Sequence, residues 1–277
     1  MLPSKPQSLI VKRSVWSSNL ESEFELIRSI IDSYPFISMD TEFPGIVFRP
    51  KTGGGAETWH RSPEDHYSVL KSNVNRLNLI QVGVTLSDRD GNLPNLGTLQ
   101  QFLWEFNFSD FNVKTDLQAP DSIVLLRTQG IDFEENNKSG IKIVRFAELM
   151  MSSGLVCNPN VSWITFHGAY DFGYLVKALT HRALPECLAD FLLLVRVFFG
   201  DRVIDVKHLM KFCSGLYGGL NNVSKKLDVK RVVGKSHQAG SDSLLTMHAF
   251  EKIRKVYFDN KDDGLVKFAG VLHGLEV

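Results

Sequence analysis

The order of predicted strands and helices is the feature that most constrains the fold. Apolar or aromatic runs at residues 36–39, 77–88 and 103–112 are typical of strands, and a turn-forming DRDGNLP sequence between the last two predicts an antiparallel hairpin. Helical periodicity then dominates, interrupted by two short strands around residues 163–166 and 202–206. An antiparallel start followed by alternating helices and strands predicts an α/β fold with a mixed sheet flanked by helices.

The domain boundaries follow from composition. Residues 1–17 are polar and contain two prolines, so we expect a loose N-terminal segment. A helix behind a serine cap is predicted to follow, and the glycine-rich stretch 49–64 is predicted to be a long loop. The rest of the sequence contains no stretch with the composition of a linker. We therefore expect a single domain over residues 18–262 and a C-terminal tail over residues 263–277.

Charge and cysteine content narrow the classes of function. Lys and Arg number 31, as do Asp and Glu, so the formal net charge is zero and any contact with nucleic acid must be local. The three cysteines form no CxxC spacing, which favours a reducing, cytoplasmic location, with the nucleus as a second compartment, over a disulfide framework. No segment approaches the roughly 20 apolar residues that span a bilayer, so we expect no membrane partner.

Two carboxylates end the first predicted strand. Asp40 and Glu42 follow the apolar run 36–39 at spacing i, i+2, which points both side chains to the same face of a strand. Most DxE triplets are solvated turns or caps, but ligands of open α/β folds bind at the carboxyl ends of strands. The pair is therefore a candidate metal site.

Three further residues complete a candidate constellation. Asp171 follows the strand at 163–166 and opens a helix, although a carboxylate in a first turn also stabilises the helix dipole by itself. His237 and Asp242 bracket Gly240 at the start of a long amphipathic helix, where Ser241 or Asp242 could equally be an N-cap. Oxygen ligands of this kind suit Mg²⁺ or Mn²⁺, and a histidine beside them is suited to take a proton from activated water. Four carboxylates and one histidine of this kind would support two-metal phosphodiester hydrolysis.

The motifs around these residues resemble one family. In order, Asp40-x-Glu42, Asp171 and His237-x4-Asp242 look like the DEDDh exonucleases, which have a ribonuclease-H-like DEDD exonuclease fold. The surrounding sequence is similar to the poly(A)-specific deadenylase subunit of the CCR-NOT complex, the CCR-associated factor family. The segments that carry this resemblance are SMDTEFPGIV, NLIQVGVTL, FHGAYDFGYLVKALT, IDVKHLMK, GGLNNVSKKL and HQAGSDSLLT, and they extend over nearly the whole chain.

The resemblance implies an activity and partners. It implies a 3′→5′ exoribonuclease that shortens poly(A) tails of messenger RNA and releases 5′-AMP with two divalent metal ions. Asp40, Glu42, Asp171 and Asp242 would then be metal ligands and His237 the general base. It further implies docking on the NOT scaffold subunit and association with a second CCR-type deadenylase.

Two aromatic residues are candidate substrate contacts. Phe43, next to the first carboxylates, could contact the terminal base, but a core position is an equal alternative. His167 follows the strand at 163–166 and is a second candidate, although a histidine there is more often a hydrogen-bonded core residue. Asp205 also ends a short apolar strand, and we expect it to be structural, pairing with Lys207 or capping the next helix.

Two other functions remain open at this point. A metal site cannot itself distinguish a base or a 2′-hydroxyl, so the chain could trim other RNA or DNA ends as a DEDDh exonuclease. It could also be a catalytically silent scaffold of a complex, because one fold hosts many functions. The presence of all five site residues argues against the scaffold.

Overall fold

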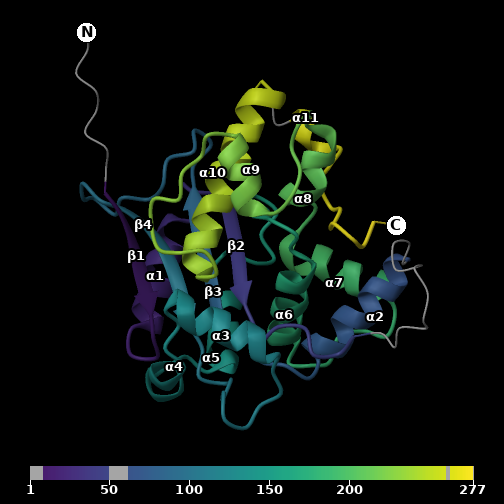
Figure 1. Ribbon diagram of the computed structural model, residues 1–277. Coiled ribbons are helices and arrows are strands. Elements are labelled where there is room, and N and C mark those ends of the chain that lie inside the picture. Colours follow the sequence, from purple (N-terminus) through teal and green to yellow (C-terminus); the bar gives the residue numbers. More distant parts are fainter. Residues whose placement is uncertain (1–8, 50–61, 260–262, 277) are drawn as a thin grey trace.

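A six-stranded mixed sheet forms the centre of the molecule. The computed structural model describes residues 9–49, 62–259 and 263–276. The strand order is β1-β4-β3-β2-β5-β6, with β3 antiparallel to β2 and β4 and the other neighbours parallel, which confirms the predicted mixed sheet (Figure 1). The strands are β1 (Ile10–Val15), β2 (Phe36–Glu42), β3 (Gln81–Ser87), β4 (Gln101–Asn107), β5 (Ser162–Thr165) and β6 (Val203–Asp205).

Helices flank the sheet on both faces (Figure 1). Those predicted from helical periodicity are α1 (Leu20–Ile30), α2 (Pro63–Val74), α3 (Pro120–Gln129), α5 (Ile143–Met151), α6 (Ala169–Thr180), α7 (Leu188–Phe199) and α10 (Ala239–Tyr257). The others are the short helices α4 (Phe133–Ser139), α8 (Val206–Leu209), η1 (Met210–Phe212), α9 (Leu220–Lys226) and α11 (Asp263–Val266). Their shortness explains why periodicity did not predict them, since a single or double turn carries little periodic signal.

The two faces of the sheet differ in polarity. On β2, Ile37 and Met39 point into the main apolar core, whereas Ser38 lies on the opposite face and donates a hydrogen bond of 2.7 Å to the carbonyl of Ser243 in α10. β3 has the same alternation, because Val82, Val84 and Leu86 belong to the core and Thr85 bonds Ser243. The α10 face therefore carries buried polar groups beside apolar contacts such as that of Phe36 with Phe250, and it is the face on which Asp40 and Glu42 lie.

Gly83 permits α10 to approach the sheet closely. A Cβ atom at Gly83 would lie 1.9 Å from the carbonyl oxygen of Ala239 and 2.4 Å from the amide nitrogen of Gly240. A side chain there would displace the first turn of α10. The glycine that interrupts the strand pattern of β3 thus fixes the position of the helix that carries Asp242.

The prediction of a loose N-terminal segment is wrong for the described residues of that segment. Ile10–Val15 form β1, parallel to β4, because the two charges that make this segment look like a surface loop have buried partners. Lys12 pairs with Glu105 at 2.5 Å and Arg13 with Glu23 at 2.6 Å.

The C-terminal residues also pack on the domain. The side chains of Leu265, Leu272 and Leu275 are buried in the core, and the amide of Gly270 donates to the carbonyl of Val203 in β6. Residues 263–276 are therefore not a free tail. Residues 50–61 of the predicted loop lie outside the described residues.

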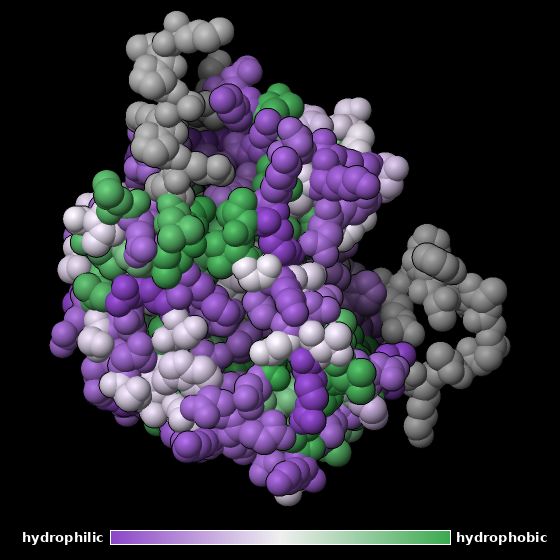
Figure 2. Space-filling view, turned by 60° about the vertical axis from the view of Figure 1, so that its left-hand side comes forward, coloured by the Kyte–Doolittle hydropathy of each residue, from purple (hydrophilic) through white to green (hydrophobic). Residues whose placement is uncertain are grey.

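None of the helices in the described part of the chain combines the length and the apolar character needed to cross a bilayer. Hydrophilic residues cover most of the face shown in Figure 2, and hydrophobic residues gather mainly in a band on its left side and in a smaller group at its lower right.

Candidate active site

Four carboxylates converge where β2 ends. Asp40 and Glu42 are at the end of β2, while Asp171 and Asp242 lie in the first turns of α6 and α10. β5, which leads into α6, runs parallel to β2 as its direct neighbour, so their carboxyl ends lie at one edge of the sheet. Asp171 follows β5 and opens a helix, as the sequence predicted, and it therefore lies at the same edge of the sheet as Asp40.

The distances show one compact site. Ligand atoms of Glu42, His237 and Asp242 all lie within 4.8 Å of one another. Asp171 is held by Thr41, whose hydroxyl donates a hydrogen bond of 2.6 Å to Asp171 Oδ1. The charges of Asp171, Asp242 and Glu42 all act on Asp40, so it belongs to the same group. The structure therefore brings together all five residues that the sequence predicted.

Asp242 is inside its helix and does not cap it. Helix α10 begins at Ala239 with Gln238 as N-cap, and the amide of Asp242 already donates to the carbonyl of Gln238. The alternative that Ser241 or Asp242 is the N-cap is therefore excluded. Polar partners in the sheet explain the earlier start: the amide of Gly240 donates to Glu105 Oε2 at 3.1 Å. The positive end of the helix dipole also favours the Asp242 carboxylate.

His237 precedes this helix in a left-handed backbone conformation, with φ at +59°. Its amide donates a hydrogen bond of 2.7 Å to Asp242 Oδ2, which fixes the turn, and its imidazole is exposed. Histidine adopts this conformation more readily than most residues, but it is still uncommon. The turn therefore presents the ring to solvent directly beside the carboxylates.

Burial raises the pKa values of three of these groups, and nearby carboxylates raise them further. Burial raises the pKa of Asp171 to about 7, against the opposing effect of the Thr41 hydrogen bond. The pKa values of Asp40 and Glu42 are also well above their usual range, first because of burial and then because of the neighbouring carboxylates. Such a group of anions is stabilised by a bound cation, and its oxygen ligands suit Mg²⁺ or Mn²⁺.

We expect the metal-free protein to become less stable as the pH rises. A carboxyl with a raised folded-state pKa contributes stability below its unfolded pKa of about 4, and this contribution is lost as the pH rises through the folded value. For Asp171 the loss is complete only above about pH 7. Thermal melts in chelator should therefore show a melting temperature that falls from about pH 4 to about pH 7.

Asp171→Asn is the control for this dependence. The asparagine cannot ionise, so its melting temperature should fall less over the same range. Adding Mg²⁺ to the native chain should stabilise it more at the higher pH, because the ion competes with protons for the same oxygens. A melting temperature that rises with pH in chelator would contradict the proposed repulsion.

Sequence reasoning missed two residues that support the site. Thr41 lies between the two carboxylates of β2, and its role in holding Asp171 has no separate sequence signal. Glu105 lies beneath the first turn of α10 and is buried between Lys12 and the amide of Gly240. A single carboxylate in the aromatic run of β4 was a usable signal, because a buried charge requires a partner.

Phe43 lies in an aromatic stack beside the site. Its ring is stacked on Tyr170 with centroids 5.2 Å apart and contacts Tyr174 at 5.0 Å. Phe43 is only partly buried and packs against the main core. The core alternative is therefore supported, because Phe43 packs against the core, while its contact with a terminal base stays a prediction.

His167 is not part of the carboxylate group. Its ring packs edge-on against His273, with centroids 4.9 Å apart, and its amide donates to Asp205 Oδ1. The charges that act on it come from Asp205, Lys207, Glu276 and His66, none of which belongs to the site. Its prediction as a substrate contact has no support from this placement.

Asp205 is structural, as predicted. Its side chain is fully buried and caps α8 by accepting from the amide of Lys207 at 2.9 Å. It also accepts from the amides of His167, Gly168 and His273. The carboxylate therefore joins the end of β5 to the C-terminal residues.

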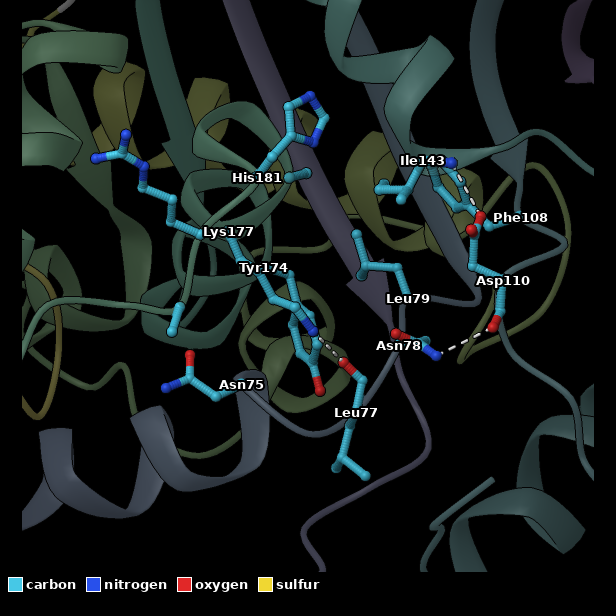
Figure 3. Close-up of a pocket in the computed structure, with 13 residues that line it drawn as sticks. Asn75, Leu77, Asn78, Leu79, Phe108, Asp110, Ile143, Tyr174, Lys177 and His181 are labelled. Atoms are coloured by element: carbon cyan, nitrogen blue, oxygen red, sulfur yellow. Dashed lines mark hydrogen bonds between the residues drawn. The ribbon is translucent and has the colours of Figure 1, made fainter. Parts of the chain in front are cut away.

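A cavity of about 300 Å³ lies at the other end of α6 (Figure 3). Its lining contains Tyr174, Lys177 and His181 from this helix or its end, and none of the five predicted catalytic residues. Lys177 donates to the carbonyls of Val74 and Leu77 at 2.9 and 3.0 Å, so its charge stabilises the C-terminal end of α2. Tyr174 connects this cavity to the Phe43 stack.

Sequence comparison identifies relatives along the chain. The profile of a family described as CAF1 family ribonuclease matches residues 15–149. A probable CCR4-associated factor 1 homologue of Arabidopsis thaliana is 53% identical over 266 residues, which are 96% of this chain and 93% of the relative. Poly(A) ribonuclease pop2 of Schizosaccharomyces pombe is 43% identical over 95% of this chain and 74% of the relative.

Solved structures agree with this result. Pop2p of S. pombe in a Mg²⁺ and Mn²⁺ bound form has a TM-score of 0.86 at 43% identity, over 95% of this chain and 99% of that one. CAF1 co-crystallised with the yeast NOT1 MIF4G domain has a TM-score of 0.76 at 32% identity, over 99% and 100%. Escherichia coli exonuclease I, at 14% identity and a TM-score of 0.54 over 82% and 42%, shares the fold. The expected exonuclease fold is confirmed.

Proposed function

The chain belongs to the CAF1 family of ribonucleases, and we propose that it is a 3′→5′ exoribonuclease that shortens the poly(A) tails of messenger RNA. The observation that carries this proposal is the convergence of Asp40, Glu42, Asp171 and Asp242 with His237 at one edge of the sheet. Retention of this whole set favours an active nuclease over a silent scaffold. The released product would be 5′-AMP.

The residues present fit a divalent metal centre. Four carboxylates supply oxygen ligands only. Burial raises the pKa values of Asp40, Glu42 and Asp171, so ionising them together is unfavourable unless a cation binds. When bound there, two Mg²⁺ or Mn²⁺ ions would polarise the scissile phosphate and lower the pKa of water. Asp40, Glu42, Asp171 and Asp242 would hold them.

The protein's own groups would perform the remaining steps. His237, exposed and beside Glu42 and Asp242, would accept the proton of the attacking water and pass it to solvent. Phe43, rigidly stacked on Tyr170, would contact the terminal base from the side of β2. A rigid aromatic surface loses little conformational entropy on binding, which suits the holding of a single nucleotide.

We also propose partners and a location for the chain. The solved complex of CAF1 with a NOT1 domain supports docking of this chain on a NOT scaffold subunit. A second CCR-type deadenylase in the same assembly is proposed from the family resemblance alone. Such recruitment would compensate for a formal net charge of zero, which gives the chain little long-range attraction for RNA. The compartment would be the cytoplasm, with the nucleus as a second one.

We expect hydrolysis of A-tailed RNA to be faster than that of other ends. Oligomers with a common 5′ sequence should be tested with A, U or C tails, together with the DNA version of the A tail. The A-tailed RNA should shorten at least about tenfold faster than the others, which corresponds to about 1.4 kcal/mol of discrimination. Equal rates on all four would support a general exonuclease, and no turnover with either metal would support the scaffold.

A further inference from the structure

Arg231 lies between α9 and α10 and contacts the metal centre from outside. Its guanidinium donates to Asp242 Oδ1 at 2.6 Å, to Ser241 Oγ at 2.6 Å and to Asn221 Oδ1 at 2.8 Å, with a weaker contact of 3.4 Å to the carbonyl of Lys235. In the described part of the chain, no other arginine or lysine forms an ion pair with the four carboxylates.

The position of this arginine is fixed from three directions. Asn221 is in α9, Lys235 is in the loop before His237, and Ser241 and Asp242 are in the first turn of α10. The ion pair is partly buried, since the Arg231 and Asp242 side chains are 17% and 10% exposed. A planar guanidinium with several acceptors in place is well ordered, and a lysine could not make all of these bonds.

Asp242 is consequently held at both of its oxygens. Oδ1 accepts from Arg231, and Oδ2 accepts from the amide of His237. Each carboxylate oxygen has a second lone-pair site, so both bonds can persist while the carboxylate also binds a cation. One guanidinium therefore fixes a proposed metal ligand and, through Asp242, the turn that carries the proposed base.

We propose that Arg231 is a positioning residue of the metal centre, which orients Asp242 and the His237 turn before any cation binds. This inference rests on the proposed function. The opposite possibility is that Arg231 is a counter-ion that the metal must displace. The two possibilities predict opposite changes in metal affinity when Arg231 is removed. Loss of a positioning residue weakens metal binding, whereas loss of a competing positive charge strengthens it.

The geometry favours positioning. Arg231 has three acceptors besides Asp242, so it is not dependent on that carboxylate, and a cation has no need to displace it. Hydrogen-bonded partners of metal ligands typically contribute about 10- to 100-fold in metal affinity. We expect the metal affinity of Arg231→Ala to be lower by about that factor, even though the variant has one positive charge fewer beside the site.

The test is a Mn²⁺ titration of the full chain without RNA, followed by calorimetry. Arg231→Ala should bind Mn²⁺ about 10- to 100-fold more weakly than the native chain. Arg231→Lys should have an intermediate affinity, because lysine keeps the positive charge but lacks the planar guanidinium with its several donors. Lys230→Ala is the matched control: it removes an exposed positive charge next to Arg231 and should leave the affinity within about twofold.

Asn221→Ala covers the case in which Arg231→Ala fails to fold. It removes one acceptor of the guanidinium without altering Asp242, and it should weaken Mn²⁺ binding by a smaller factor than Arg231→Lys. If the Arg231 variants fold and bind Mn²⁺ as tightly as the native chain or more tightly, the inference is overturned. If they do not fold, the same result in Asn221→Ala overturns it. The nuclease proposal stays intact in either case. If the native chain binds no Mn²⁺ at all, both fail.

Discussion

Asp40→Asn should abolish RNA hydrolysis and at the same time raise the melting temperature of the metal-free protein. The substitution removes one of four carboxylates that together would hold the metal ions, so activity should fall at least about 100-fold. It also removes a charge that repels Asp171, Asp242 and Glu42. Relief of that repulsion should stabilise the fold, with each kcal/mol gained corresponding to roughly 2 to 4 °C.

The combination of the two effects is what distinguishes a metal site from a structural carboxylate. Initial rates on A-tailed RNA and thermal melts in chelator measure them separately. Asp32→Asn changes the same chemical group at an exposed position, so both quantities should stay at native values. Activity that survives in Asp40→Asn, or a large loss of stability in chelator, would mean that Asp40 has been assigned wrongly.

His237→Asn should lower the turnover number by about 10²- to 10⁴-fold while metal binding stays within about threefold of native. The ring is exposed, and asparagine tolerates the left-handed backbone at this position, so the fold and the amide bond to Asp242 should be retained. Asparagine cannot accept the proton at neutral pH. The variant should therefore bind metal and RNA but turn over slowly.

Rates at saturating RNA and a Mn²⁺ titration of the same preparation would measure both quantities. His181→Asn is a matched control, since His181 is also exposed and has a left-handed backbone but is part of the cavity lining at the far end of α6. It should turn over at the native rate. A loss of metal affinity in His237→Asn that equals its loss of activity would instead identify His237 as a metal ligand.

The positions of the site residues were predictable where local sequence determines the structure. Pro35 and the apolar run 36–39 mark β2, so Asp40 and Glu42 could be placed at a strand end. Asp171 and Asp242 could be placed near the starts of helices from the periodicity that follows each of them. The pairing of β2 with β5 then brings Asp171 to Asp40 and Glu42, and the packing of α10 on β2 and β3 brings Asp242 to them.

The features that sequence could not show depend on partners that are distant in the chain. β1 was missed because the partners that neutralise Lys12 and Arg13 are Glu105 and Glu23, and no local pattern connects them. The start of α10 was misplaced for a similar reason, since its first amides are bonded by groups from β3 and β4.

Arg231 is the clearest example of this kind. It is one of several basic residues in the KKLDVKR run, and a charge run is usually a solvated surface. Only the folded chain shows that this member of the run, and not Lys230 beside it, pairs with Asp242.

The most direct test of the central claim is to identify the product released from A-tailed RNA by mass spectrometry, with Mg²⁺ and with chelator. If the four carboxylates and His237 form a 3′→5′ exonuclease site, 5′-AMP should be the first and dominant product, and chelator should abolish its release. Internal fragments, nucleoside 3′-phosphates, or release that continues in chelator would contradict the account.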